Sequence, residues 1–160
     1  MQYHPRRVRN EILDASEITA LIKTGNHITL ALCDDDIPYV VTMSYGFDDV
    51  NNRLYFHCAN KGDKLEYINK NSNVCGTIIK DNGYIKTKCD HDYESLIIRG
   101  KILVVNDLEE KKHALQVMLK HLEEDPKPIF ERNITDDDSY NKVTILRMNM
   151  ESIIGKKYIG

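Results

Sequence analysis

The chain contains 160 residues, of which 41% are hydrophobic and 29% are charged, and its formal net charge at pH 7 is -3. This size and composition are typical of one folded domain and exclude a largely disordered protein, so we expect residues 1–160 to form a single domain. The acidic residues are spread along the sequence and leave no broad basic face, which argues against nucleic-acid binding. No run of about 18 apolar residues is present, and residues 1–10 lack the apolar core of a secretion signal, so we expect a cytoplasmic protein with no membrane insertion.

The first half of the chain has the pattern of one helix followed by three β-strands. Asn10 can cap a helix that Gly25 ends. Alternating apolar residues and turn-forming residues then predict a hairpin and a third strand. The three predicted strands are HITLALC (27–33), YVVTMSYGF (39–47) and RLYFHC (53–58).

The second half adds further strands and two helices. A short helix is expected from Lys64 to Asn71, and a capping box at Asn106 and Glu109 predicts a longer amphipathic helix that packs on the sheet. Gly100 lies inside a long apolar run and predicts a strand that bends at a barrel corner. The predicted strands of this half are NVCGTIIK (73–80), YESLIIRGKILVV (93–105) and VTILRMNM (143–150).

The remaining segments are polar. Residues 81–83 predict a turn, and residues 86–92 an excursion at a sheet edge. Residues 123–138 carry little periodic signal and are expected to form a surface loop or short irregular helix that can act as a lid. Residues 151–157 form a basic tail that can return to the mouth of the sheet. Mainly antiparallel connections between these strands predict a mainly β fold, a β-barrel with α-helical decoration.

The cysteines and histidines do not form a recognisable metal site. The cysteines contain no Cys-x-x-Cys pair, and three of them lie in apolar runs, where a free thiol usually behaves as a small hydrophobic group. We therefore favour buried thiols over disulfides or a zinc site. His113 and His121 lie about two helical turns apart, which is too far for both to bind one metal ion. The cysteines are Cys33, Cys58, Cys75 and Cys89.

Residues 54–64, LYFHCANKGDK, combine a strand end, a turn and a helix start. The first N–H groups of a helix lack intrahelical partners and carry partial positive charge, so an anion is favoured at such a corner. Gly62 allows the backbone to approach a ligand closely, and Lys61 and Lys64 add full positive charges. The corner therefore has the composition of a phosphate site. An ordinary turn with solvated lysines is the alternative.

Six strings follow one another in a specific order between residues 10 and 157. They are PYVVTMSYGF, LYFHCANKGDKLEYINKN, VCGTI, YESLIIRGK, VVNDLEEKKHALQVMLKHL and ILRMNMESIIGKK. The most specific spacing within them is His-x-Ala-x-x-Gly-x-Lys, formed by His57, Ala59, Gly62 and Lys64. Together these strings resemble the FMN-binding split-barrel superfamily related to pyridoxamine 5'-phosphate oxidase, and most closely its nitroimidazole-resistance branch.

This resemblance implies a six-stranded antiparallel split β-barrel that forms a homodimer, with one FMN in each of two clefts at the subunit interface. Val41, Thr42 and Met43 would lie along the isoalloxazine ring and the ribityl chain. Lys64 would pair with the phosphate, at the corner that His57 begins. The implied cofactor-binding residues are Val41, Thr42, Met43, His57, Cys58, Ala59, Lys64, Ser95 and Lys156.

The resemblance also implies an oxidoreductase that reduces a small planar electrophile such as a nitroaromatic. His57 would be the catalytic proton donor, because an imidazole changes charge near neutral pH. Electrons would come from a nicotinamide nucleotide or a redox protein that docks transiently, since the chain lacks the glycine fingerprint of a Rossmann domain.

Two positions in the sequence limit the substrates that the resemblance implies. Tyr39 and Asp63 occupy candidate positions for the basic residues that pyridoxamine phosphate oxidases use to hold their phosphorylated substrate, which argues against vitamin B6 oxidation. Two alternatives stay open: a non-catalytic flavin-binding or electron-transfer protein, and a related split barrel that uses haem or a deazaflavin.

Overall fold

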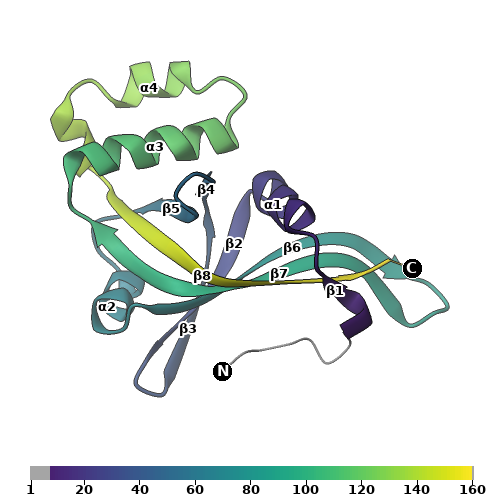
Figure 1. Cartoon of the computed structure of the whole chain (residues 1–160). Coiled ribbons are helices and arrows are strands. Elements are labelled where there is room, and N and C mark those ends of the chain that lie inside the picture. Colours follow the sequence, from purple (N-terminus) through teal and green to yellow (C-terminus); the bar gives the residue numbers. More distant parts are fainter. Residues whose placement is uncertain (1–7, 160) are drawn as a thin grey trace.

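The computed structural model describes residues 8–159, which form one curved β-sheet with helices packed around it (Figure 1). The strands are β1 (Glu11–Ile12), β2 (His27–Asp34), β3 (Ile37–Ser44), β4 (Gly46–Asp48), β5 (Arg53–Cys58), β6 (Asn73–Ile85), β7 (Asp90–Val105) and β8 (Thr144–Tyr158). The helices are α1 (Ala15–Thr24), α2 (Asp63–Lys70), α3 (Leu108–Leu122) and α4 (Lys127–Asn133), with short 3-10 helices η1 (Val8–Asn10) and η2 (Asp137–Asn141).

Every strand pair of the sheet is antiparallel, so the predicted mainly β fold with helices is confirmed. The strand order is β3-β2-β6-β7-β8-β5-β4, with β1 added to β8. The short strands β1 and β4 are additional to the six strands that were expected. The two ends of the sheet, β3 and β4, are separated in the chain by Tyr45 alone. The sheet therefore curls back toward its own start, as in a split barrel.

The run predicted as one strand over residues 39–47 is divided at Tyr45 into β3 and β4. The Tyr45 side chain is fully buried, and its hydroxyl donates a hydrogen bond of 2.6 Å to the carbonyl oxygen of Ile22. Gly46 then passes so close to α3 that a Cβ atom there would lie 2.5 Å from the Cα of Met118. Because the buried tyrosine and the close approach of α3 interrupt the pleat, the single-strand prediction is wrong.

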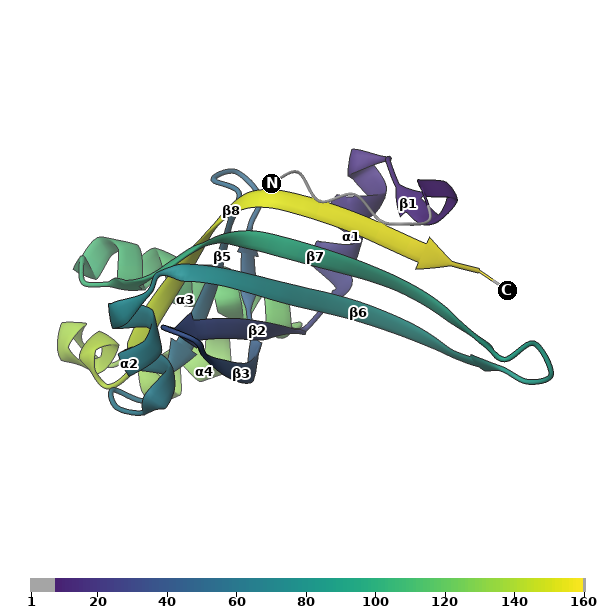
Figure 2. The same cartoon turned by 90° about the horizontal axis from the view of Figure 1, so that it is seen from below.

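β6 and β7 continue as a long hairpin arm beyond the body of the sheet (Figure 2). The turn predicted at residues 81–83 is instead an irregularity inside β6, and the chain reverses at residues 86–89. Side-chain pairs across the arm, such as His91 Nε2 with Asp81 Oδ1 at 2.6 Å, hold its two strands together. Residues 86–92 are thus the tip of a hairpin and its first returning residues, not an excursion at a sheet edge.

The pairing of β7 is irregular at Gly100, where the sequence predicts a bend. The register with β8 shifts between Arg99 and Gly100, and a Cβ atom at Gly100 would overlap the carbonyl oxygen of Asn149. Only glycine permits this close approach of the two strands. Residues 151–157, expected as a separate tail, are the second half of β8 and pair with β7. This backbone pairing with β7 carries the strand on past its predicted end.

Two helices are capped by a different residue than predicted. Asp14 caps α1 in place of Asn10, because the chain between them first forms β1 and pairs with β8. Asp107 caps α3 in place of Asn106, and its carboxylate accepts a hydrogen bond of 2.8 Å from the N–H of Glu110. Both predicted helices exist, and each begins later than expected.

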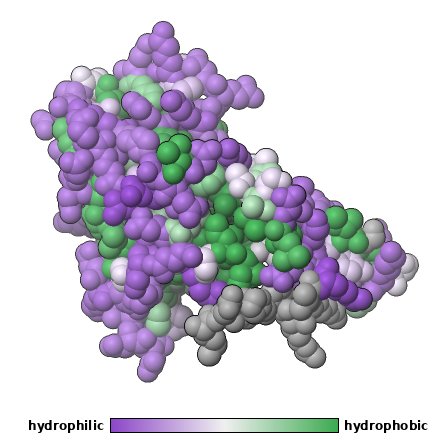
Figure 3. All heavy atoms as spheres, in the orientation of Figure 1, coloured by the Kyte–Doolittle hydropathy of each residue, from purple (hydrophilic) through white to green (hydrophobic). Residues whose placement is uncertain are grey.

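α3 packs on the outside of the sheet, and both of its histidines contact the barrel. His113 Nε2 lies 2.8 Å from Asp48 Oδ2, and His121 Nε2 lies 2.7 Å from the carbonyl oxygen of Gly25. The outer surface over α3 and α4 is mostly hydrophilic (Figure 3). A second apolar cluster fills the space beneath α3, and it consists of Tyr55, Val105, Ala114, Met118 and Ile145. Within residues 8–159, no helix is long and apolar enough to cross a membrane.

Candidate functional site

The corner between β5 and α2 has the strand, turn and helix that the sequence predicts. Gly62 is the N-cap of α2 with a φ of 134°, and no atom lies within 4 Å of the place where its Cβ would stand. The backbone is therefore open to a ligand here, and no side chain caps the first N–H groups of the helix. The carboxylates of Asp63 and Glu66, in the first turn of the helix, would repel an anion. The positive charge of Lys64 is therefore needed to attract one.

One groove of about 330 Å³ brings together seven of the nine residues that the resemblance implies. It lies between β3, the end of β5 and the start of α2. Ser44 also lines the groove, although no pattern in the sequence distinguishes it from its neighbours in the strand. The lining residues are Val41, Thr42, Met43, Ser44, His57, Cys58, Ala59 and Lys64.

β3 supplies the groove with a free strand edge. It ends the sheet, and β2 is its partner in the described part of the chain. The N–H and C=O groups of an edge strand that point away from its partner can bond to the polar edge of a ligand. Met43 is buried toward the barrel core, whereas Thr42 is exposed and its hydroxyl lies 2.9 Å from that of Thr29. The backbone of β3 is therefore the part of this wall that can recognise a ligand.

Lys64 contributes an uncompensated charge to the groove. Its side chain is half-buried, and it has no hydrogen-bond or ion-pair partner among residues 8–159. Burial raises the pKa of the Cys58 thiol, and the positive charge of Lys64 partly opposes this rise. The charge of Lys64 thus acts on Cys58, a residue that lines the groove. A phosphate group fits this position, because it would give the ammonium a partner and meet the open helix start.

The cysteines are less buried than predicted. All four are free thiols, and none is fully buried: Cys33, Cys58 and Cys75 are half-buried, and Cys89 is exposed at the tip of the arm. The apolar runs that contain the first three form strands near an edge or a groove, so one side of each thiol is left uncovered. No group of three or more His, Cys, Asp or Glu side chains within residues 8–159 is placed to hold a metal ion.

Ser95 and Lys156 do not line the groove of their own chain. They face each other across β7 and β8, with Ser95 Oγ 3.4 Å from the Lys156 carbonyl oxygen. His57 pairs with Ile145 at the other end of β8. Eleven residues of strand separate Ile145 from Lys156, a distance of up to about 36 Å. Neither of these two predicted residues is therefore part of the groove lining in one chain.

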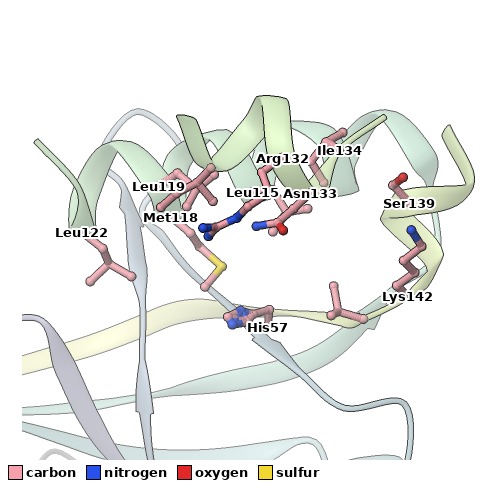
Figure 4. Close-up of a pocket in the computed structure, with 12 residues that line it drawn as sticks. His57, Leu115, Met118, Leu119, Leu122, Arg132, Asn133, Ile134, Ser139 and Lys142 are labelled. Carbon is pink, nitrogen blue, oxygen red and sulfur yellow. The ribbon is translucent and has the colours of Figure 1, made fainter. Parts of the chain in front are cut away.

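A second cavity, of about 390 Å³, lies beside the groove, between β5 and the helices α3, α4 and η2 (Figure 4). Residues 123–138, predicted as a loop or irregular helix, form α4 and the start of η2, and they cover this cavity. The spacing of Leu115, Leu119 and Leu122 could have indicated this cavity. These residues form an apolar stripe on α3 beside the apolar stripe that packs on the sheet. The lining residues are His57, Leu115, Met118, Leu119, Leu122, Ile129, Arg132, Asn133, Ile134, Ser139, Lys142 and Val143.

His57 is the one side chain that lines both the groove and the second cavity. It has no hydrogen-bond partner within the described residues. The side chain is exposed, yet enough protein surrounds the ring that desolvation lowers the pKa of His57. The imidazole is therefore mainly neutral at pH 7 and becomes protonated only in more acidic solution. A proton-donor role would be strongest below neutral pH.

Comparison with solved structures gives the same fold. A candidate 5-nitroimidazole antibiotic resistance protein from Bacteroides thetaiotaomicron is 28% identical, with a TM-score of 0.77 over 91% of this chain and 85% of that one. The flavocytochrome Anf3 from Azotobacter vinelandii is 14% identical, with a TM-score of 0.82 over 99% and 73% of the two chains. The FAD and haem binding protein from Mycobacterium smegmatis is also 14% identical, with a TM-score of 0.79 over 94% and 74%. At 14% identity the likeness concerns the fold alone.

A comparison with curated proteins finds no match. A family model described as pyridoxamine 5'-phosphate oxidase matches residues 14–157, which span nearly the whole sheet and both cavities. The predicted resemblance is thereby confirmed. This chain belongs to the pyridoxamine 5'-phosphate oxidase family.

Proposed function

We propose that this protein binds FMN in the groove between β3 and α2 and uses it to reduce small planar electrophiles such as nitroaromatics. The observation that carries the proposal is the combination, in one groove, of a free strand edge and the unpartnered ammonium of Lys64 at an open helix start. A flat ring with polar edges suits the first feature, and a phosphate suits the second. Family membership and the flavin proteins among the structural neighbours, one of which binds FAD and haem, support a flavin as the ligand.

The flavin would supply the redox chemistry, because it accepts and donates two electrons reversibly at one ring system. Reduction of a nitro group to a nitroso group takes up two electrons and two protons and releases water. A nicotinamide nucleotide or a reduced redox protein would provide the electrons. The protein would hold the acceptor against the flavin, and His57 would deliver one of the protons in its protonated form.

A homodimer is part of this proposal. Ser95 and Lys156 do not line the groove of their own chain, and in this proposal they contact the cofactor that is bound by a second copy. β3 also exposes apolar side chains at the edge of the sheet: Ile37 and Val40 each keep 63% of their surface accessible. Sedimentation of the flavin-loaded protein tests this part, and a monomer that binds FMN tightly would contradict it.

The cofactor is tested by extraction. The purified protein should be yellow, and mass analysis of the released compound should give FMN. FAD, a deazaflavin or haem in its place would overturn the FMN assignment and identify the alternative directly. A colourless protein that does not take up FMN at micromolar concentration would overturn the flavin assignment as a whole.

Enzymatic function is tested separately. The bound flavin is reduced without oxygen, and its reoxidation by a nitroimidazole is followed in the visible spectrum. Fast reoxidation is expected. A flavin-loaded protein that nitroaromatics do not reoxidise would instead be a flavin-binding or electron-transfer protein.

A further inference from the structure

We propose that the second cavity binds the electron acceptor, and that this acceptor is an aromatic compound carrying an anionic group such as a carboxylate. The role of the ligand as an electron acceptor rests on the proposed function, but binding of the ligand can be measured independently. The cavity is separate from the groove and meets it at His57. A ligand there would lie directly beside a flavin in the groove.

The walls of the cavity are apolar and suit an aromatic ring. Leu115, Leu119 and Leu122 of α3 supply one part of this lining, and Ile129 and Ile134 from α4 and its end supply another. In Figure 4 both helices lie above the opening and His57 lies below it. The buried thioether of Met118 points from α3 toward His57, and sulfur makes favourable contacts with aromatic rings. A volume of about 390 Å³ is in the range of sites for small organic ligands.

Two cations stand at the rim of this apolar space. Arg132 extends its guanidinium into the opening above His57, and Lys142 lies at the other end near Ser139 (Figure 4). Neither Arg132 nor Lys142 has an ion pair or side-chain hydrogen bond in the described part of the chain. A planar guanidinium can bind a carboxylate through two parallel hydrogen bonds.

Two acidic residues near the rim, Asp136 and Asp137, have side-chain partners of their own. Asp136 accepts hydrogen bonds from the N–H and the hydroxyl of Ser139, at 2.9 and 2.8 Å. Asp137 forms an ion pair of 3.0 Å with Lys112. The charge of Lys142 also lowers the pKa of the Asp136 carboxyl, so Arg132 is the rim cation that the described residues leave for a ligand. A ligand with its anionic group at the rim and its ring in the apolar space would contact both the positive charge and the apolar walls of the cavity.

The test compares 4-nitrobenzoate with its methyl ester, which has the same ring and nitro group but no charge. Calorimetric titration of the purified protein with its natural cofactor content should show tighter binding of the acid. Arg132→Gln should weaken binding of the acid by roughly ten-fold or more and change binding of the ester much less. Lys127→Gln is the matched control, because this exposed lysine lies on α4, pairs with Glu131 and does not line the cavity.

A second variant examines the apolar wall. Leu119→Trp should fill the cavity and weaken both compounds, while circular dichroism and cofactor content show that the protein is still folded. Equal affinity for acid and ester, or an unchanged affinity of Arg132→Gln for the acid, would overturn the proposal.

The cofactor content of the same samples separates this proposal from the proposed function. Arg132-dependent binding in a protein without flavin would support the anion site and overturn the redox function. A flavin-loaded protein that binds neither compound would support the flavin and overturn the second cavity as the acceptor site. If the extract contains haem and 4-nitrobenzoate does not bind, the acceptor proposal is overturned.

Discussion

The groove and the second cavity meet at His57, yet they are built in different ways. The groove uses two short segments, residues 41–44 and 57–64, each continuous in the chain. The second cavity combines residues from β5, α3, α4, η2 and the start of β8, which come together only when α3 docks on the sheet. The first site therefore depends on local strand, turn and helix signals. The second depends on tertiary packing, and a change in the docking of α3 should affect it more than the groove.

The largest expected effect concerns His57, which belongs to both sites. His57→Ala should slow reoxidation of the reduced flavin by a nitroimidazole by about 100-fold in weakly acidic solution, because a positioned general acid is lost. In the wild type the rate should fall as pH rises, since burial lowers the pKa of His57 and the imidazolium is present only below it. Stopped-flow measurements across pH 5 to 8 check both points. An unchanged rate in a variant that still holds its flavin would remove His57 from the mechanism.

The next prediction isolates the groove. Lys64→Ala removes a charge-assisted contact worth roughly 1.5–3 kcal/mol, so affinity for FMN should fall by about ten-fold or more. Riboflavin lacks the phosphate and should lose much less. Lys61→Ala is the control, because Lys61 is exposed in the same turn and does not line the groove. An equal loss for FMN and riboflavin would place Lys64 in the fold and not in the phosphate site.

A third variant addresses the second cavity through the docking of α3. Gly46→Val would force a side chain against the backbone of Met118 and should destabilise the fold by about 1–3 kcal/mol. Ligand binding in the second cavity should weaken more than FMN binding in the groove. Urea denaturation and the two titrations measure these effects, with the exposed Ala31→Val as a control for adding a branched residue to a strand. Equal losses at both sites would show that the two regions are not independent.

The smallest effect is expected at the break between β3 and β4. Tyr45→Phe leaves the carbonyl oxygen of Ile22 without its buried hydroxyl partner and should cost about 1–2 kcal/mol of stability. Tyr84→Phe is a matched control, because Tyr84 is exposed on the arm. The midpoint of urea denaturation should shift for the first variant and stay constant for the second. A shift of equal size in both would mean that the hydrogen bond of Tyr45 does not stabilise the fold.

The accuracy of the sequence predictions follows the same division between local and long-range structure. The corner from His57 to Lys64 could be predicted because a strand end, a glycine turn and a helix start are adjacent in the chain. The irregular pairing at Gly100 was predictable for a similar reason, since glycine inside a long strand indicates a close approach.

Features that depend on distant partners could not be predicted. Asn10 has a good capping side chain, but the residues after it pair with β8, and Asp14 becomes the cap. Tyr45 looks like any strand tyrosine until its hydroxyl reaches Ile22. Arg132 and Lys142 lie in segments without periodic pattern, and only the packing of α4 and η2 brings them to one rim.

The place of β8 in the sheet has a consequence for how the protein is made. β8 lies between β7 and β5 and also pairs with β1, so the last strand of the fold joins three earlier ones. Until this strand has left the ribosome, β5 has β4 as its strand partner and the groove lacks a fixed wall. Completion of the sheet must therefore wait for residues 144–158, and pairings between residues as distant as Glu11 and Lys156 make it slow. During synthesis, the nascent chain presents unpaired strand edges that a chaperone can shield.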